Sequence, residues 1–187
     1  MSVYTRIGDD GTTALFGGKR ILKCEELVDV YGSIDELNSW IGVLFATTLN
    51  AKNKKMLGVI QSDLFLIGST LAGWRGDISS LAKRILDMEQ RIDEIEKVVP
   101  KLSHFIFPGG SKEAAFVHVA RSLTRRVERQ MVAFFSKKQH VTKQQKDDQY
   151  IIISYLNRLS DLLFMTARDI NTSVGVKEVI WKGTYEK

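Results

Sequence analysis

The segment LAKRILDMEQRIDEIEKVVP, residues 81–100, carries the clearest structural signal in the chain. Its apolar residues recur at alternating spacings of four and three positions, which is typical of one face of an α-helix. These residues are Leu81, Ile85, Met88, Ile92, Ile95 and Val99. Pro100 cannot continue a helix interior, so it marks the end of the pattern. The segment therefore predicts an amphipathic helix that packs against other elements through one face.

The same period appears in two segments before it. The first helix has its apolar positions at Val30, Ile34, Leu37, Ile41 and Leu44. The second has them at Leu57, Ile60, Leu64, Ile67 and Leu71 and ends near Gly73. The start of the first helix stays open, because Ser33 and Glu36 fit a capping box while residues 25–30 could equally be its first turns.

A fourth helix follows the turn FPGGS, residues 107–111. Ser111 can cap it, Glu113 suits the positive first turn, and the pattern continues to about residue 135. Its apolar stripe consists of Phe116, Ala120, Leu123, Val127, Met131 and Phe134.

The polar stretch SKKQHVTKQQKDD, residues 136–148, interrupts the helical pattern. We expect it to be an exposed, mobile connection, with nucleic-acid contact as the less favoured interpretation. A last helix is expected over about 150–170, followed by a short tail that packs through Trp181.

These elements predict an all-α fold. Strands do not alternate with helices, no repeat has a solenoid period, and most connections are short, which favours an up-and-down bundle of four or five long helices. We expect a single domain over residues 1–187, with an N-terminal segment (1–24), a helical bundle (25–172) and a C-terminal tail (173–187).

Composition narrows the possible functions. The 187 residues are 44% hydrophobic and carry a formal net charge of +5, which allows anionic partners such as nucleotides or nucleic acid. Aromatic residues interleaved with basic ones are not evident, so a nucleic-acid binder is disfavoured. The chain has one cysteine, Cys24, no apolar run long enough for a bilayer and no secretion signal, so we expect a cytoplasmic protein without membrane contact.

Candidate binding residues gather on the polar face of the fourth helix. Arg121, Arg125, Glu128 and Arg129 fall opposite its apolar stripe. The face could simply be solvated, yet arginines one turn apart repel one another unless an anion lies between them, and arginine suits bidentate phosphate contacts. Both interpretations stay open at this point.

Two further helices carry polar pairs. Asn157 and Asp161 lie one turn apart on the last helix, and Asp35 and Asn38 lie one turn apart on the first. Asn157 is a mediocre helix former in mid-helix, which makes a specific hydrogen-bonding role plausible.

The opening segment YTRIGDDGTTALFGGKR, residues 4–20, is rich in glycine, threonine and basic residues. Glycines let backbone amides approach an anion, and Arg6, Lys19 and Lys23 add positive charge. The segment is not a P-loop, because Thr13 and Arg20 stand where that motif needs glycine and a serine or threonine. A phosphate-binding role and a flexible leader both remain open from the residues alone.

Three segments in this order resemble the PduO-type ATP:cob(I)alamin adenosyltransferases. They are YTRIGDDGTTALFGG with YGSIDELNSWIG, then FPGGSKEAAFVHVARSLTRRVERQMV, then YLNRLSDLLFMTAR, and the likeness runs from about residue 3 to residue 172. The resemblance implies an enzyme that transfers the 5′-deoxyadenosyl group of ATP to the cobalt of cob(I)alamin and releases triphosphate. It also implies a ferritin-like five-helix bundle, a homotrimer with active sites between subunits, and use of Mg²⁺ with ATP. A cobalt reductase and an adenosylcobalamin-dependent enzyme are further partners that it allows.

The resemblance also assigns roles to residues. Asp35 of one subunit would pair with Arg121 of its neighbour, Arg125 would act at the nucleotide, and Phe105 would displace the lower axial base of cob(II)alamin. The ATP-binding residues would be Thr5, Arg6, Ile7, Gly8, Thr13, Ala14, Lys23, Arg125, Arg126, Val127, Glu128, Arg129 and Asn157. No protein metal ligand is implied. Ile7 departs from the family pattern, where threonine is common, and the 136–148 stretch is longer and more basic than usual.

Overall fold

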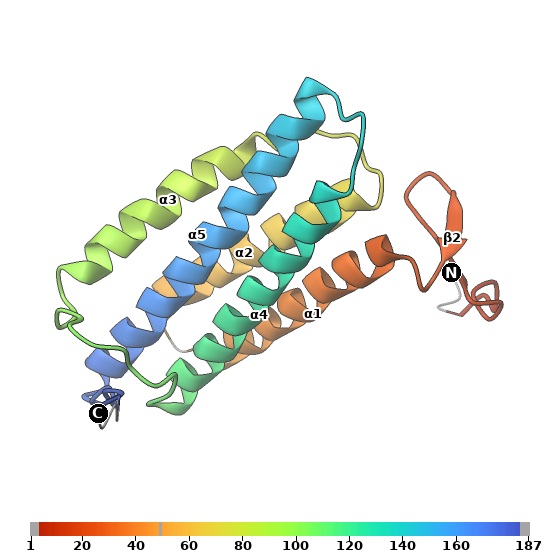
Figure 1. Ribbon diagram of the computed structural model, residues 1–187. Coiled ribbons are helices and arrows are strands. Elements are labelled where there is room, and N and C mark those ends of the chain that lie inside the picture. The colour runs from red at the N-terminus through yellow and green to blue at the C-terminus, as the bar shows by residue number, and fades with distance from the viewer. Residues whose placement is uncertain (1–3, 49, 184–187) are drawn as a thin grey trace.

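The structure is a computed structural model that describes residues 4–48 and 50–183, and within them the chain is almost entirely helical (Figure 1). The helices are α1 (Glu26–Thr47), α2 (Ala51–Leu71), α3 (Ser80–Glu96), α4 (Lys112–Ser136) and α5 (Lys143–Ser173). They lie roughly side by side as a bundle, as the apolar periodicity predicts.

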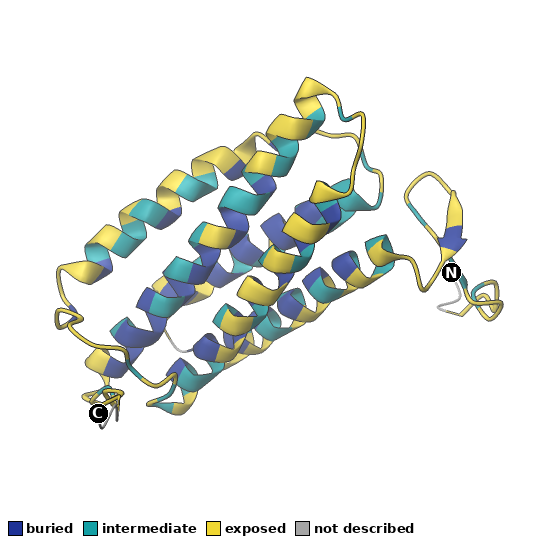
Figure 2. Cartoon of the chain, viewed as in Figure 1, coloured by how far each residue is buried: buried dark blue, intermediate teal, exposed yellow. Residues whose placement is uncertain are grey.

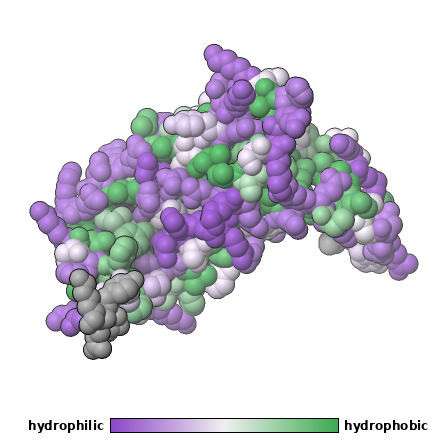
Figure 3. Space-filling view, viewed as in Figure 1, coloured by the Kyte–Doolittle hydropathy of each residue, from purple (hydrophilic) through white to green (hydrophobic). Residues whose placement is uncertain are grey.

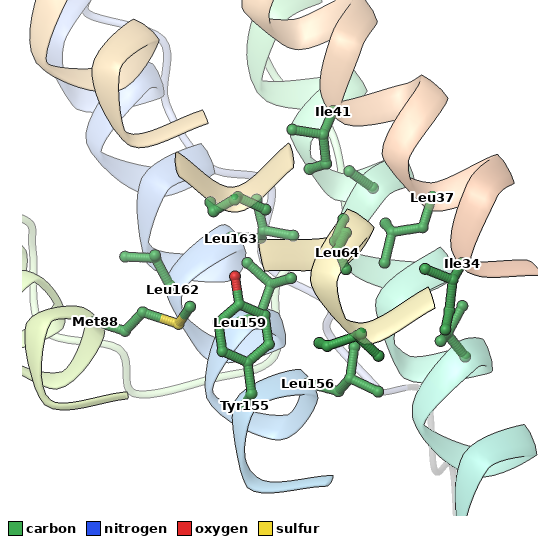
Figure 4. Close-up of a cluster of buried hydrophobic side chains, with 14 of the residues drawn as sticks. Ile34, Leu37, Ile41, Leu64, Met88, Tyr155, Leu156, Leu159, Leu162 and Leu163 are labelled. Carbon is green, nitrogen blue, oxygen red and sulfur yellow. The ribbon is translucent and has the colours of Figure 1, made fainter. Parts of the chain in front are cut away.

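The order of packing runs α3, α5, α4, α1, α2, because α5 contacts both α3 and α4, and α1 contacts both α4 and α2. Each helix turns its apolar stripe inward, so that buried residues follow one face of each ribbon (Figure 2). In the core, Ile34 and Leu37 of α1 lie near Leu64 of α2 and Leu156 of α5 (Figure 4). The predicted core positions of the helices are confirmed.

The end of α3 lies a few residues before the one that the sequence pattern predicts, and the start of α1 settles a point that the sequence left open. In α3, Leu81, Met88 and Ile95 are buried, and the helix ends at Glu96, so Val99 is buried just beyond it. In α1, the helix begins at Glu26 and Ser33 Oγ donates to the carbonyl oxygen of Asp29 at 2.9 Å. The alternative capping box at Ser33 is therefore wrong, since this residue lies inside the helix.

The stretch 136–148 is only partly a connection. Thr142 caps α5 in a capping box with Gln145, and the helix proper begins at Lys143. The expectation of a continuous loop is wrong for residues 143–148, which form the largely exposed first turns of α5. These turns cover no core, so they carry none of the apolar periodicity by which the sequence marks a helix.

A small antiparallel hairpin precedes the bundle and projects from its end beside α1 (Figure 1). Strands β1 (Thr12–Ala14) and β2 (Arg20–Leu22) pair through a turn in which Gly17 and Gly18 have φ values of 84° and 86°. Phe16 N–H donates to the carbonyl oxygen of Ala72 at 3.0 Å, which attaches the turn to the end of α2.

No helix within the described ranges is both long and apolar enough to cross a membrane.

Candidate functional site

A cleft of about 480 Å³ lies between α4 and α5, next to the end of α3. Arg121 and Arg125 of α4 line it together with Arg158, Asp161 and Arg168 of α5. Figure 3 shows hydrophilic residues over much of the face that α4 and α5 form, with hydrophobic patches between them. The predicted residues Arg121 and Arg125 thus share one concave surface.

Arg121 is held in an electrostatically unfavourable place. Its guanidinium is half-buried, and its Nε has no hydrogen-bond partner among the described residues. Burial and, after it, the positive charge of Arg125 lower the pKa of Arg121, although an arginine remains protonated at neutral pH. An anion in the cleft would relieve this repulsion and satisfy the free donor.

The rest of the RRVER run, residues 126–129, points to several sides of α4. Glu128 Oε1 accepts a hydrogen bond of 3.0 Å from Asn157 Nδ2, so the predicted residues of α4 and α5 meet. Arg126 forms an ion pair with Glu36 of α1, and Arg129 is exposed. Val127 is fully buried in the core, so its side chain points away from this face.

The N-terminal segment forms a compact loop whose basic side chains bind its own carbonyl oxygens. Lys23 Nζ donates to the Gly8 carbonyl at 2.8 Å, and Arg20 donates to the Ile7 carbonyl at 2.6 Å. Arg6 adopts a φ of 60°, and Thr5 Oγ1 accepts from the backbone N–H of Ile7 at 3.4 Å. Thr13 and Ala14 lie in β1, where both pair with β2.

This loop and the arginine cleft are not brought together within one chain. The loop projects beside the start of α1 (Figure 1). The residues that line the cleft include Ile92 and Glu96, at the end of α3. Asp35 is exposed on α1 and forms no ion pair with any described residue, Arg121 included.

Phe105 lies in the connection between α3 and α4 and is 77% exposed. Its ring meets the ring of Trp181 edge-on, with the centroids 6.2 Å apart, so the predicted packing of the tail through Trp181 is confirmed. Asn171 holds the following turn, because its side chain accepts from Ser111 N–H and donates to the Gly109 carbonyl, both at 2.9 Å.

Sequence reasoning missed several residues near the cleft. Arg158 bonds both Glu89 and Asp161, at 3.0 and 2.7 Å, and Arg168 is buried in an ion pair with Glu178. His118 is buried in α4, where burial and the neighbouring Arg121 lower its pKa to about 4. The sequence did carry a signal for Arg168 and His118, because each is an ionisable residue placed close to the apolar stripe of its helix.

The fold and the site together define a class of protein. It is a helical bundle with an arginine-lined cleft that is suited to a polyanionic ligand. The family model for cobalamin adenosyltransferases matches residues 3–170. The chain therefore belongs to the cobalamin adenosyltransferase family.

Individual relatives agree with this assignment. The chain is 40% identical over 179 residues to a corrinoid adenosyltransferase of Citrobacter freundii, covering 93% of this chain and 97% of the relative. It is 39% identical to a corrinoid adenosyltransferase of Bacillus subtilis, with 96% and 91% covered.

Solved structures of the same class share the fold. One is a variant PduO-type ATP:corrinoid adenosyltransferase from Lactobacillus reuteri complexed with cobalamin and ATP, with a TM-score of 0.84 and 31% identity over 97% of this chain and all of that one. Another variant from the same organism, complexed with ATP, has a TM-score of 0.81 and 32% identity over 96% of this chain and 100% of that one.

Proposed function

We propose that this protein transfers the 5′-deoxyadenosyl group of ATP to the cobalt of cob(I)alamin, forming adenosylcobalamin and releasing triphosphate. Family membership supports the reaction, and the arginine-lined cleft is the observation in the structure that carries it. A departing triphosphate is a highly charged leaving group, and unpaired guanidinium donors in a concave site are suited to stabilise it.

The reaction demands little acid–base chemistry from the protein. The electron pair of cobalt(I) attacks C5′ of ATP, the Co–C bond forms, and the C5′–O bond breaks with its electrons passing to triphosphate. The protein holds C5′ in line with cobalt and compensates the charge on the phosphates. Arg121 and Arg125 supply positive charge to the cleft from α4, and the exposed Arg129 adds a third charge on the same helix. The pair of Glu128 and Asn157 offers hydrogen-bonding groups between α4 and α5.

The N-terminal loop is the proposed second half of the nucleotide site. Its glycines, its threonine hydroxyls and Lys23 are groups that bind phosphate oxygens. Lys23 and Arg20 now donate to carbonyl oxygens of the loop itself, at Gly8 and Ile7. These hydrogen bonds can be exchanged for phosphate contacts without moving the bundle.

We place the complete site between adjacent copies of the chain, in a homotrimer. The separation of the N-terminal loop from the cleft supports this arrangement, as does the lone carboxylate of Asp35, which can pair with Arg121 of a neighbouring copy. A large hollow of about 760 Å³ beside α1 and α2 is lined by the exposed rings of Phe16 and Phe65. Such apolar exposure is suited to burial in an assembly.

Mg²⁺ is better suited to bind on the phosphates of the substrate than within a set of protein ligands. The described residues hold no group of three or more His, Cys, Asp or Glu that could bind a metal. Mg²⁺ keeps several waters and commonly enters sites on phosphate oxygens, so it would arrive on the triphosphate of ATP.

The experiment that tests the function is direct. Cob(I)alamin, generated with a chemical reductant, is mixed with the protein and MgATP under anaerobic conditions, and the spectrum of adenosylcobalamin is followed. Conversion only when both ATP and the protein are present supports the proposal. An unchanged cob(I)alamin spectrum at micromolar protein would refute it.

A further inference from the structure

The C-terminal tail pairs with the segment that carries Phe105. Ile106 and Ile180 form an antiparallel bridge. Phe107 N–H donates to the Val179 carbonyl at 2.9 Å, and Trp181 N–H donates to the Phe105 carbonyl at 2.8 Å. The backbone from the carbonyl of Phe105 to the N–H of Phe107 is thus fixed by the tail.

This pairing matters because little else holds the Phe105 ring. The side chain is 77% exposed, and its aromatic contact is with Trp181, which is itself 44% exposed. A side chain outside the core takes its direction from the backbone that bears it. The direction of Phe105 therefore depends on the register of the tail.

One buried guanidinium secures that register. Arg168 of α5 is 3% exposed, and its Nε and Nη2 donate to the two carboxylate oxygens of Glu178 at 2.8 and 3.2 Å. Nη2 also donates to the Pro100 carbonyl at 2.6 Å. Glu178 directly precedes the paired residues of the tail, and Pro100 begins the segment that leads to Phe105. Arg168 thus binds both of the segments that pair with each other, the tail and the connection that leads to Phe105.

A buried ion pair is a costly way to gain stability, since an apolar side chain of similar volume commonly does as well. The bidentate geometry of the pair fixes the position of the tail relative to α5 more strictly than apolar packing would. Arg168 also lines the cleft with Arg121 and Arg125, while Glu178 lines an adjoining hollow of about 350 Å³ that His104 and Ile106 share.

We infer that the ion pair of Arg168 and Glu178 is a positioning device that sets the direction of Phe105 and thereby the displacement of the lower axial base from cob(II)alamin. This inference rests on the proposed function and on the role that the family resemblance implies for Phe105. Arg168 and Glu178 act through Phe105 and need not touch either substrate.

The test uses Glu178→Ala, with Glu178→Gln as the conservative variant. Asp169→Asn is the matched control, because Asp169 is the next residue of α5 and its ion pair with Arg91, at 3.1 Å, joins α5 to α3 without touching the tail. Phe105→Ala serves as the reference for complete loss of the displacing ring.

The first readout needs no substrate. Amide hydrogen exchange is measured at Phe107 and Trp181, whose N–H groups make the pairing bonds. We expect Glu178→Ala to speed exchange there by about tenfold and Glu178→Gln by less, with core amides of α5 unchanged. Asp169→Asn should leave both amides as in the wild type.

The second readout follows cobalt. With cob(II)alamin and MgATP, electron paramagnetic resonance distinguishes cobalt that keeps an axial nitrogen from four-coordinate cobalt. Glu178→Ala should lower the four-coordinate fraction towards that of Phe105→Ala. With a chemical one-electron reductant added, it should reduce kcat from cob(II)alamin about tenfold, with the KM for ATP within about twofold of wild type. With cob(I)alamin as the starting substrate the loss should be smaller, since displacement has then been bypassed.

The two proposals fail in different ways. A wild-type protein that makes no adenosylcobalamin refutes the function, and the exchange readout still tests the clamp. If the wild type is active and Glu178→Ala keeps wild-type exchange at Phe107 and Trp181, or a wild-type four-coordinate fraction, the positioning role is refuted.

Discussion

Lys23 Nζ lies 2.8 Å from the carbonyl oxygen of Gly8 and donates a hydrogen bond to it, closing the N-terminal loop on itself. A Cβ on Gly8 would come within 3.3 Å of this same Nζ, so the glycine leaves the ammonium group room at the loop. The lysine thus both holds the loop and carries the charge that we expect to meet the phosphates of ATP.

Replacing Lys23 by methionine keeps most of the length of the side chain and removes its charge. Because a charge-assisted hydrogen bond contributes about 1.5 to 3 kcal/mol, the KM for ATP should rise about tenfold or more. Steady-state kinetics with ATP varied would measure this. Lys83→Met, at an exposed position of α3 outside the loop, is the control and should stay near wild type.

Arg125 offers the sharpest test of the cleft. It is exposed on α4, so Arg125→Ala should leave the helix content and the thermal midpoint nearly unchanged while turnover falls below detection. Circular dichroism and the cobalamin assay measure the two effects. Lys83→Ala, at an exposed position of α3, should retain activity. Turnover within threefold of wild type in Arg125→Ala would remove that arginine from the mechanism.

Deletion of residues 1–20 should separate fold from nucleotide binding. The buried core begins to build up in α1, and the turn of the hairpin is attached to the bundle by the bond from Phe16 to Ala72. The truncated chain should therefore stay helical, with a cooperative thermal transition, and show no heat of ATP binding by calorimetry. Retained ATP affinity would contradict the proposed role of the loop.

His118 predicts a dependence of stability on pH. Burial and Arg121 lower its folded-state pKa to about 4, while Glu178 opposes the shift and the unfolded imidazole titrates near its ordinary value of 6.5. The unfolded state then binds more protons between these values, so stability falls as the pH drops from about 6.5 towards 4.

Urea unfolding at pH 7.5 and 5.0 would measure this effect. The free energy of unfolding should be lower at pH 5.0, with about 1 to 3 kcal/mol assignable to His118. His118→Gln should reduce that difference, whereas between pH 7.5 and 8.5 the variant and the wild type should show the same slope. An equal loss in both proteins at pH 5.0 would count against the assignment.

The sequence predicted the bundle because its information is periodic. Residues such as Leu81, Met88 and Ile95 report burial by spacing alone, and the structure confirms it. The sequence did not predict a helix at residues 143–148, because exposed helical turns carry no apolar period. The sequence did not predict the hairpin, because two strands of three residues are too short to show an alternation of apolar and polar residues.

The candidate site was harder to predict, because contacts between distant residues have no local signal. The arginine face of α4 was visible from helical spacing, but the bond from Asn157 to Glu128 joins two helices and the pair of Arg168 and Glu178 joins a helix to the tail. Only the folded chain shows that Arg121 is left with an unpaired donor.

The distance of the N-terminal loop from the cleft has a genetic consequence. If each complete site takes its loop from one copy and its arginines from another, a chain that lacks residues 1–20 and an Arg125→Ala chain each lack a different half of that site. Two inactive proteins, unfolded together at equal concentration and reassembled, should then regain activity, because about one quarter of randomly formed sites would receive two intact halves. Alleles of this gene would complement one another, and the pattern of complementation would assign every site residue to one side of the boundary between subunits.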